Sequence, residues 1–411
     1  MKKVVVIGGG PAGMMAAMSV SKKAEVVLLE SNEKLGKKLF ITGKGRCNIT
    51  NAKDISDFFD YIPGNPEFLY SSLYTFTNKD TMNFFESLDV KLKVERGDRV
   101  FPFSDKSSDI INAFTKALYR NKVSVKLNSK VEKIVKKDGI ISYVVLKNGE
   151  KVSGDYFILT TGGKSYPLTG STGDGYRFAK ELGHHIIPLK PSLVPIEVKE
   201  AWIKDLQGLS LKNVELSIIN GKKKIYKEFG EMLFTHYGIS GPLVLSGSRY
   251  VTSDKELIAS IDLKPALSEQ ELDKRVQKDF LEFKNKDIKN SLNELLPQKI
   301  IIPVIHKSGI DENKKINSIT KLERKNLVNA IKHFTLSISG LRPIEEAIVT
   351  AGGVDINEID AHTMQSTLVK NLYFAGEVID VDAYTGGYNI QIALSTGFMA
   401  AKSILDKIAS L

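Results

Sequence analysis

A glycine-rich turn that directly follows an apolar strand is the feature that most constrains how this chain can fold. Residues 4–7 (VVVI) are apolar, and Gly8, Gly10 and Gly13 follow them in a G-x-G-x-x-G frame. In dinucleotide-binding folds the first glycine permits a tight turn, the second lets the backbone approach a pyrophosphate, and the third lets the helix pack against the strand. Residues 14–20 are expected to form that helix, whose N-terminus favours negative charge. We therefore expect a Rossmann-like unit at the start of the chain, with dinucleotide contacts from Gly8, Gly10, Pro11, Ala12 and Gly13.

A second apolar run supports this prediction and limits the choice of nucleotide. Residues 26–29 (VVLL) end at Glu30, about 20 residues beyond Gly10, where a carboxylate can accept hydrogen bonds from ribose hydroxyls. The glycine frame itself is shared by sites for FAD, NAD and NADP. A carboxylate at Glu30 repels a 2′-phosphate, which argues against NADP in this particular pocket.

Chain length and cysteine content limit the domain organisation and the chemistry. A chain of 411 residues is long for one core, so two or three domains are expected. Because the first strand is expected at Val4 and no apolar run approaches the length of a membrane span, we expect neither a secretory signal nor a membrane contact, and a cytoplasmic location. The single cysteine, Cys47, excludes an internal disulfide, a C-x-x-C redox pair and a cysteine-based zinc site, and no metal is expected.

The formal charge of +10 is compatible with a polyanionic partner such as RNA. Lysines and an arginine crowd residues 34–46, and Lys222, Lys223 and Lys224 form a second basic cluster. The alternative is a lysine-rich surface that is simply solvated, and the sequence leaves both open.

The pattern of apolar residues changes along the chain in a way that predicts the domain order. Residues 1–190 alternate strand-like runs (4–7, 26–29, 123–127, 141–146 and 156–160) with helical stretches such as 105–120, whereas residues 191–262 have the short alternating segments of a small antiparallel sheet or barrel. Residues 263–333 are expected to be helical, with Ser268 as an N-cap and helices over 269–281, 288–296 and 321–333. Residues 334–345 return to the β-rich domain and residues 346–411 resume the α/β pattern, with a strand at 372–375 and a closing helix from Tyr388. We therefore predict an α/β fold in which two separate segments build one nucleotide-binding domain around a β-rich domain and a small helical insert.

Two further glycine-flanked segments are expected to meet the first glycine turn. Strand 156–160 is followed by Thr161, Gly162 and Gly163, and strand 372–375 is followed by Gly376 and Glu377. Gly386 and Gly387 then precede the closing helix. Glycines at a helix N-terminus expose N–H groups, and the positive end of the dipole can stabilise the anionic reduced ring of a flavin. The alternative for each segment is a turn that needs a permissive backbone and contacts no ligand.

Several longer motifs together resemble the BaiN/YhiN-type flavoproteins, a family of NAD(P)/FAD-dependent oxidoreductases. These motifs are GKGRCNITN (residues 43–51), RVFP (99–102), GGKSYP (162–167), GSTGDG (170–175), FTHYGISGP (234–242) and the stretch 376–389. They occur in order over nearly the whole chain. The resemblance implies non-covalent FAD in a two-segment Rossmann-like domain, a β-rich substrate domain and a small helical insert.

The resemblance also implies which residues contact the cofactor. Besides the first glycine turn and Glu30, the cofactor-binding residues expected on this basis are Lys38, Gly45, Arg46, Cys47, Asn48, Val131, Thr161, Gly162, Gly376, Glu377, Asp382, Gly386, Gly387, Tyr388 and Asn389. No second dinucleotide frame is visible, so NADH or NADPH is expected to dock transiently as the electron donor.

The substrate is left open between several classes. Relatives have been linked to enone reduction in bile-acid intermediates, to oxidation of aminoacetone and to reduction of uridine in ribosomal RNA. We expect an NAD(P)H-driven reductase of an activated C=C bond, acting on a small enone or on uridine in ribosomal RNA. The alternatives are an amine oxidase that uses oxygen and a flavin-binding redox sensor without turnover.

Reduction of such a bond needs a hydride from the flavin and a protein group that protonates the neighbouring carbon. His236 is the first candidate for this acid, because imidazole exchanges protons near neutral pH. Tyr166 and Tyr384, beside glycine-rich loops, are the next candidates. Cys47 is a further candidate if Arg46 lowers the pKa of its thiol, although a packing role under the flavin is the stronger expectation.

Overall fold

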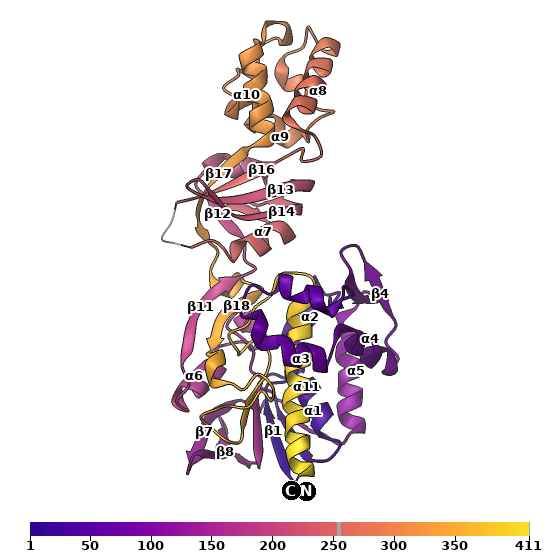
Figure 1. The fold of residues 1–411 in the computed structure, drawn as a ribbon, viewed down its shortest axis with the longest axis vertical. Coiled ribbons are helices and arrows are strands. Elements are labelled where there is room, and N and C mark those ends of the chain that lie inside the picture. The colour runs from indigo at the N-terminus through magenta and orange to yellow at the C-terminus, as the bar shows by residue number, and fades with distance from the viewer. Residues whose placement is uncertain (253–255, 411) are drawn as a thin grey trace. The chain divides into compact units, whose positions relative to one another are not determined.

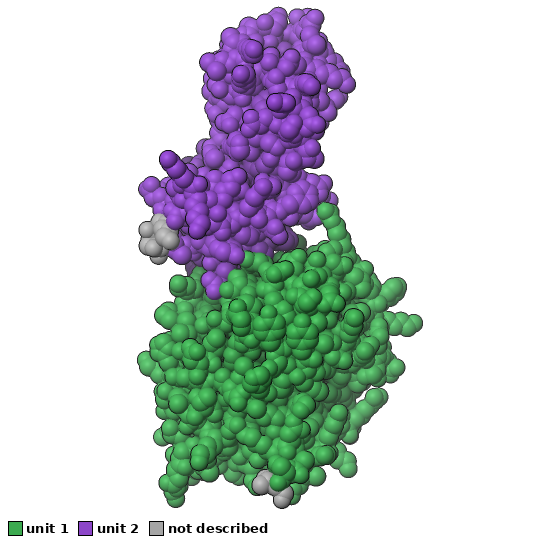
Figure 2. Space-filling model, in the orientation of Figure 1, with its two compact units in different colours: residues 1–192, 344–411 green, residues 193–343 purple. Residues whose placement is uncertain are grey.

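The computed structural model describes residues 1–252 and 256–410 and divides the chain into two compact units. Unit 1 consists of Met1–Ser192 and Ile344–Leu411, and unit 2 of Leu193–Pro343 (Figure 2). Each unit has its own cluster of buried apolar side chains. The chain passes between the units after Ser192 and before Ile344, within two residues of the transitions expected from the sequence at 190 and 346.

A five-stranded parallel sheet forms the centre of unit 1, in the strand order β19-β10-β1-β2-β6. The strands are β1 (Lys3–Ile7), β2 (Glu25–Leu29), β6 (Ser124–Lys126), β10 (Tyr156–Leu159) and β19 (Leu372–Phe374). Their apolar side chains are mostly buried, as expected of parallel strands that are covered on both faces. Because β19 comes from the C-terminal segment, two separate segments build this sheet and the predicted fold is confirmed.

Helices cover the sheet and follow its strands (Figure 1). Helix α1 (Pro11–Val20) contacts β1, β2 and β10 and packs along α11 (Tyr388–Ala409) and α5 (Ser107–Arg120). The remaining helices of unit 1 are α2 (Lys37–Ile41), α3 (Tyr70–Thr75), α4 (Asn78–Ser87) and α6 (Asp174–Glu181). Short 3-10 turns of unit 1 span Ile55–Tyr61, Pro66–Leu69, Pro167–Thr169, Ile344–Glu346 and Ile356–Glu358.

Three small antiparallel sheets surround the central one. One is β3-β5-β4 (Thr50–Asn51, Arg99–Pro102 and Leu92–Glu95), the second is β7-β8-β9 (Val131–Lys137, Ile140–Leu146 and Lys151–Ser153), and the third pairs β11 (Ile186–Ser192) with β18 (Val349–Val354). The apolar run at 141–146 is thus a strand, as expected, but it pairs in an antiparallel meander outside the central sheet.

Unit 2 contains a closed six-stranded barrel in the order β12-β15-β14-β13-β16-β17. Its strands are β12 (Ile196–Val198), β13 (Ser210–Asn220), β14 (Lys223–Phe234), β15 (Gly238–Ser240), β16 (Leu257–Asp262) and β17 (Phe334–Leu341). The helix α7 (Pro242–Ser248) contacts β14, and a 3-10 turn η4 (Ala201–Leu206) follows β12. The basic cluster Lys222–Lys224 lies exposed at the hairpin between β13 and β14.

Three helices are inserted between β16 and β17: α8 (Glu269–Glu282), α9 (Gln298–Lys307) and α10 (Lys321–Lys332). The Ser268 side chain accepts a hydrogen bond from the Glu271 N–H in a capping box, so its predicted role at the start of α8 is confirmed. The helix expected over 288–296 is wrong. Only a 3-10 turn forms there, at Ile288–Asn290, with a second such turn at Ile316–Ser318.

Contacts with a distant loop set the backbone of this segment, because the Ile288 and Lys289 N–H groups donate to the Lys314 and Glu312 carbonyls (3.0 and 3.4 Å). Pro297 disfavours helical backbone at the residue before it and is the N-cap of α9. The buried side chains of Leu292, Leu295 and Leu296 have the spacing of a helix but pack from irregular backbone.

In the part of the chain that the structure describes, every helix is too short or too polar to cross a membrane.

Candidate active site

The carboxyl ends of β1, β10 and β19 meet at one edge of the central sheet. Ile7 pairs with Leu159, and Leu159 pairs with Phe374, so the segments that follow these three strands leave the sheet side by side. A hydrogen bond from the Ala375 N–H to the Leu159 carbonyl (3.1 Å) continues this alignment. In parallel α/β sheets this edge is where nucleotides bind. The three glycine segments found in the sequence therefore lie together.

The glycines of the first turn differ in what a side chain would meet. Gly8 has φ +111°, and a Cβ there would lie 2.5 Å from the Thr160 carbonyl oxygen. A Cβ on Gly13 would collide with the Gly8 carbonyl, which is the close contact between helix and strand that this position requires. Around Gly10, by contrast, no protein atom of the described chain lies within 4 Å of a Cβ. The backbone at Gly10 thus borders open space, where a pyrophosphate can approach.

Helix α1 begins at that open space. Gly10 is its N-cap, Pro11 is its first residue, and no described side chain caps its N-terminal N–H groups. Unpaired N–H groups and the positive end of a helix dipole together favour a phosphate. The arrangement fits a dinucleotide pyrophosphate.

Glu30 lies beside the same turn, with only 7% of its surface exposed. Its Oε2 accepts a hydrogen bond from the Gly9 N–H (2.7 Å), and its Oε1 accepts bonds from the Asn32 backbone and side chain (both 2.8 Å). A carboxylate can accept about four hydrogen bonds. Glu30 is therefore held in place at the turn, and Oε2 can accept a further bond from a ribose hydroxyl.

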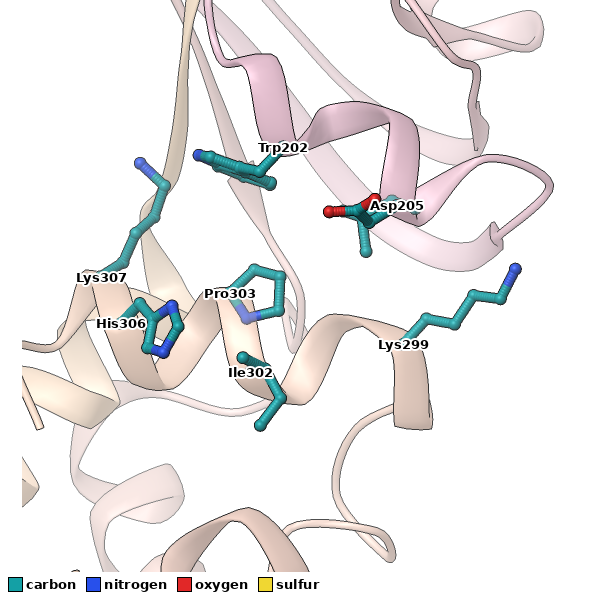
Figure 3. A pocket seen from close by; sticks show the side chains of 8 residues that line it. Trp202, Asp205, Lys299, Ile302, Pro303, His306 and Lys307 are labelled. Atoms are coloured by element: carbon teal, nitrogen blue, oxygen red, sulfur yellow. The ribbon is translucent and has the colours of Figure 1, made fainter. Parts of the chain in front are cut away.

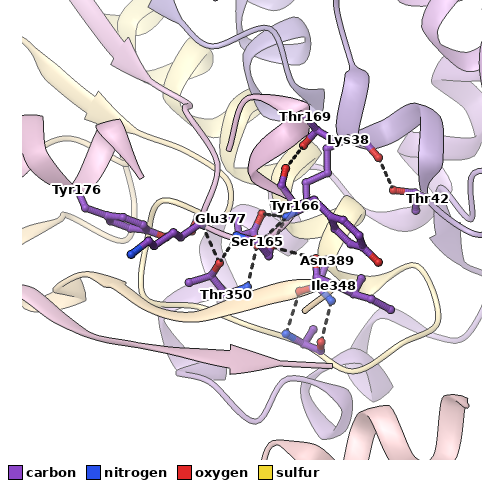
Figure 4. A network of polar contacts seen from close by, with 12 residues as sticks. Lys38, Thr42, Ser165, Tyr166, Thr169, Tyr176, Ile348, Thr350, Glu377 and Asn389 are labelled. Carbon is purple, nitrogen blue, oxygen red and sulfur yellow. Dashed lines mark hydrogen bonds and ion pairs between the residues drawn. The ribbon is translucent and has the colours of Figure 1, made fainter. Parts of the chain in front are cut away.

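A polar network joins α2 to the segments after β10 and β19 (Figure 4). The Lys38 ammonium donates to Glu377 Oε2 (2.7 Å) and to Ser165 Oγ (2.7 Å). Glu377 Oε1 also accepts the Thr350 N–H (2.8 Å), and a Cβ on Gly163 would lie 2.5 Å from Thr350 Oγ1. Lys38 and Glu377, both predicted to contact the cofactor, thus bind each other and fix three loops. The roles of Ser165 and Thr350 were not predicted from the sequence, although Ser165 lies within the quoted motif GGKSYP.

The N-terminus of α11 closes the same edge. Gly386 and Gly387 have φ +132° and +101°, and a Cβ on Gly387 would collide with the Thr50 carbonyl of β3. Gly387 is the N-cap of this 22-residue helix, and no described side chain caps it. The helix therefore presents the positive end of its dipole, which stabilises negative charge on a group placed there.

Other residues predicted to contact the cofactor instead hold the protein's own loops. The Asn389 side chain accepts the Ala383 N–H (3.0 Å) and donates to the Ala383 carbonyl (2.7 Å), and Asp382 Oδ2 accepts a bond from Ser192 Oγ (2.9 Å). The Tyr388 ring is buried between Phe58 and Tyr61, at centroid distances of 4.9 and 4.8 Å. Val131 is buried at the start of β7. These side chains support the site, and their contact with a cofactor stays a prediction.

The segment around Cys47 corrects one expectation. Arg46 donates to Asp105 (2.7 Å from Nε) and pairs with Glu95, and its guanidinium lies 4.2 Å from the Phe101 ring centroid. The Arg46 guanidinium is therefore paired with these two carboxylates. Cys47 is fully buried, and this burial raises the pKa of its thiol. The lowered pKa considered for Cys47 is wrong, because desolvation of the buried thiol raises its pKa while Arg46 is paired with Glu95 and Asp105.

Asn48 Oδ1 and Thr161 Oγ1, both at predicted cofactor residues, are buried without a hydrogen-bond partner in the described chain. Buried polar atoms nearly always have partners. A bound ligand that brings donors to this edge of the sheet would satisfy them. Gly45, near Asn48, also borders open space, since no described protein atom lies within 4 Å of a Cβ there. These features, with Gly10 and Glu30, fit FAD.

The three remaining candidates for the proton donor lie in different units. Tyr166 and Tyr384 belong to unit 1, beside the glycine segments. Tyr166 has left-handed backbone (φ +52°), and burial raises the pKa of its phenol. His236 belongs to unit 2, where it is exposed in the turn between β14 and β15 against the Tyr237 ring.

In the described residues, no three His, Cys, Asp or Glu side chains are grouped so as to hold a metal ion.

Comparison with known proteins gives matches over nearly the entire chain. Residues 2–403 match the family model described as HI0933-like protein Rossmann domain. The chain is 30% identical to the 3-dehydro-bile acid delta(4,6)-reductase of Clostridium scindens, over 99% of this chain and 100% of that protein. It is 32% identical to the ribosomal RNA dihydrouridine synthase of Haemophilus influenzae, over 97% of this chain and 98% of that protein.

Solved structures with a similar fold are more distant in sequence. The open conformation of a flavocytochrome c3 fumarate reductase matches with a TM-score of 0.52 and 17% identity, over 98% of this chain and 78% of that chain. The 3-ketosteroid delta1-dehydrogenase of Sterolibacterium denitrificans matches with a TM-score of 0.50 and 12% identity, over 99% of this chain and 100% of that chain. At these sequence identities the similarity shows a shared fold and nothing about activity.

Proposed function

This chain belongs to the HI0933-like family, and from that premise we propose that this FAD-dependent oxidoreductase reduces a C=C bond conjugated to a carbonyl, with uridine in ribosomal RNA as its substrate. The observation that carries the proposal is similarity over almost the full length to two proteins named for such reductions. Dihydrouridine is uridine reduced at the C5–C6 bond, which is conjugated to the C4 carbonyl. The two names therefore describe one type of reaction on different substrates.

The residues at the sheet edge have distinct tasks in this proposal. The N–H groups at the start of α1 bind the pyrophosphate, and Glu30 accepts hydrogen bonds from ribose. FAD bound there would supply the hydride from its reduced ring. The N-terminus of α11 stabilises negative charge. The Lys38–Glu377 pair holds the loops after β10 and β19 in place, and NADH or NADPH is the proposed source of electrons.

Reduction adds a hydride to one carbon of the double bond and a proton to its neighbour. We propose Tyr166 as the group that holds this proton. Its backbone is left-handed, which is uncommon for a tyrosine. Such conformations recur at functional sites, where the surrounding structure holds them in place. Because burial raises the pKa of Tyr166, its phenol keeps its proton at neutral pH. His236 and Tyr384 are the alternatives.

Two variants distinguish the donors. If Tyr166 is the donor, Tyr166→Phe leaves FAD bound and flavin reduction by nicotinamide unchanged, while reoxidation by substrate slows about 100-fold or more. His236→Asn then reoxidises at the native rate. The opposite pattern assigns the proton to His236 and contradicts the choice of Tyr166.

RNA is favoured as the substrate by the charge of the protein and by the dihydrouridine synthase relative. The protein carries a formal charge of +10, and its exposed Lys222–Lys224 cluster can contact phosphates. A small enone is the second candidate, because the bile-acid reductase relative is 30% identical over 99% of this chain. A substrate in the ribosome requires a cytoplasmic protein, so the expected cytoplasmic location is part of the same proposal.

The test is an anaerobic spectral titration of the purified holoprotein. NADH or NADPH is expected to bleach the flavin, and uridine-containing RNA is expected to restore its colour in the absence of oxygen. Restoration by an enone and not by RNA would support the second candidate. Bleaching by an amine and recovery only in air would indicate an oxidase, and no response to either nicotinamide or amine would indicate a redox sensor; both results would contradict the proposal.

A further inference from the structure

Unit 2 contains a pocket far along the chain from the glycine segments (Figure 3). It lies between the 3-10 turn η4 and helix α9, and its volume is about 450 Å³. Sites for small organic groups range from about 300 to 1,000 Å³. None of the residues that line it belongs to the FAD site described above.

The pocket has two apolar sides. Figure 3 shows the Trp202 indole on one side and the side chains of Ile302 and Pro303 on the other. Trp202 is half-buried, and its ring packs edge-on against Phe334 at a centroid distance of 6.0 Å. A flat ring can enter between an indole and a pyrrolidine, and base–aromatic stacking is the usual way proteins bind unpaired bases.

Lysines lie at the two ends of this pocket. Lys299 and Lys307 are eight positions apart on α9, about 12 Å along the helix axis. Both side chains are exposed, and in the described chain neither forms an ion pair: Lys299 donates to the Gln207 carbonyl (3.0 Å), and Lys307 donates to Thr335 Oγ1 (3.4 Å) and lies 6.0 Å from the Trp202 ring centroid. Both ammonium groups are therefore available to an anion.

The charge of the whole unit has the same sign. Unit 2 contains 25 Lys and Arg and 19 Asp and Glu, so it carries +6 of the +10 of the chain. Asp205, which also lines the pocket, can accept hydrogen bonds from the N–H groups of a base. Because the two lysines are far apart, one phosphate does not easily contact both, whereas successive phosphates of a strand can.

We propose that this pocket binds one nucleotide of a single-stranded RNA segment, with the base against Trp202 and neighbouring phosphates on Lys299 and Lys307. This inference rests on the proposed RNA substrate and adds a second contact region, in which the strand is held by unit 2. Recognition is by stacking and charge, so it is tolerant of sequence. Selection of the uridine to be reduced then belongs to the site in unit 1.

Trp202 is the only tryptophan of the 411 residues, so its fluorescence reports directly on the pocket. The holoprotein is titrated with a short single-stranded oligouridylate, with UMP and with polyglutamate. The expected result is quenching of Trp202 by the oligonucleotide, with weak binding of UMP and of polyglutamate. Equal binding of polyglutamate would show attraction by charge alone and would overturn the proposal, as would equal binding of UMP.

Variants measure separately the contributions of base stacking and of phosphate contacts to RNA binding, with labelled RNA as the probe. Trp202→Ala is expected to weaken RNA binding about 5- to 150-fold, which corresponds to the loss of one stacked base. Lys299→Gln/Lys307→Gln is expected to make the slope of log affinity against log salt shallower by about 1.4, or about 0.7 per phosphate. Lys278→Gln, an exposed lysine on α8, is the matched control and should change neither quantity.

The outcomes separate this inference from the proposed function. The double lysine variant touches only exposed side chains, so it tests the pocket even if Trp202→Ala fails to fold. If RNA reoxidises the flavin and binds all variants equally, the pocket proposal is wrong and the RNA reductase stands. If RNA neither binds nor reoxidises the native protein, both proposals are wrong.

Discussion

Breaking the ion pair between Lys38 and Glu377 is expected to lower the free energy of unfolding of the native protein by about 2 kcal/mol. The pair joins α2 to the segment after β19 at an Nζ–Oε2 distance of 2.7 Å, and its side chains are 23% and 20% exposed. Glu377→Gln keeps the shape of the side chain and removes the charge. The Lys38 ammonium then loses its carboxylate while remaining mostly buried.

The magnitude follows from the burial. At 2.7 Å the Coulomb attraction is about 1.5 kcal/mol in a dielectric like water and about 6 kcal/mol at an effective dielectric constant of 20. Exposed pairs measure about 0.2–1 kcal/mol, and removal of one partner from a fully buried pair costs about 3–5 kcal/mol. A pair that is about one-fifth exposed lies between these limits.

A double-mutant cycle measures this coupling by urea unfolding of the holoprotein. The variants are Lys38→Met, Glu377→Gln and both together, and the expected interaction energy is about 1.5–2 kcal/mol. The control cycle uses Lys402 and Asp406 on α11, which are also 2.7 Å apart but 50% and 65% exposed. There we expect about 0.3 kcal/mol. Equal coupling in the two cycles would refute the reasoning from burial.

The same variants report on the cofactor site. Because Glu377 also accepts hydrogen bonds from Ser165 Oγ and the Thr350 N–H, its replacement loosens the loop that carries Gly162 and Gly163. FAD is therefore expected to dissociate more readily from Glu377→Gln than from the Lys402 and Asp406 variants, as measured by the release of flavin fluorescence.

Three further predictions concern single residues. Gly10→Ala is expected to fold with native stability but to lose FAD, because its methyl group meets no described protein atom within 4 Å and enters the open space. Gly13→Ala should be recovered unfolded, because its methyl group collides with the Gly8 carbonyl. Full flavin content in Gly10→Ala would contradict this reasoning. Since burial raises the pKa of the Cys47 thiol, iodoacetamide should alkylate the native protein at least about tenfold more slowly than the urea-unfolded protein, and equal rates would show that the thiol is accessible. Burial also lowers the pKa of His184 below its unfolded value of about 6.5, so the unfolded state binds more protons than the native state in acid. Below a pH of about 6.5 the free energy of unfolding should therefore fall by at most about 1.4 kcal/mol per pH unit. His184→Gln should reduce this decline.

Local sequence was sufficient where local geometry decides the structure. Gly8 has a left-handed φ in the turn and Gly13 contacts the Gly8 carbonyl, both within one strand, turn and helix, so their spacing predicted the unit. Ser268 was recognisable as an N-cap because its partner Glu271 is three positions away. Helix α9 was missed because Pro303 lies inside it, and an interior proline argues against a helix when only propensity is considered.

The site depends on contacts that local sequence does not contain. Lys38 and Glu377 are 339 positions apart, and the strand order β19-β10-β1-β2 brings the segments that carry them together. Arg46 is adjacent to Cys47 in sequence, yet its charge is directed to Glu95 and Asp105 on another sheet and the following loop. Adjacency in sequence therefore predicted the wrong pKa shift, while the orphaned oxygens of Asn48 and Thr161 became visible only after folding.

The most direct test of the central claim is mass analysis of nucleosides from RNA treated with the native holoprotein. Unmodified ribosomal RNA is incubated anaerobically with the protein and NADH or NADPH, then digested to nucleosides. The account predicts a uridine that has gained two hydrogen atoms, formed only when both FAD and nicotinamide are present. RNA that keeps every uridine unreduced, while an enone is reduced by the same preparation, would contradict the proposed substrate.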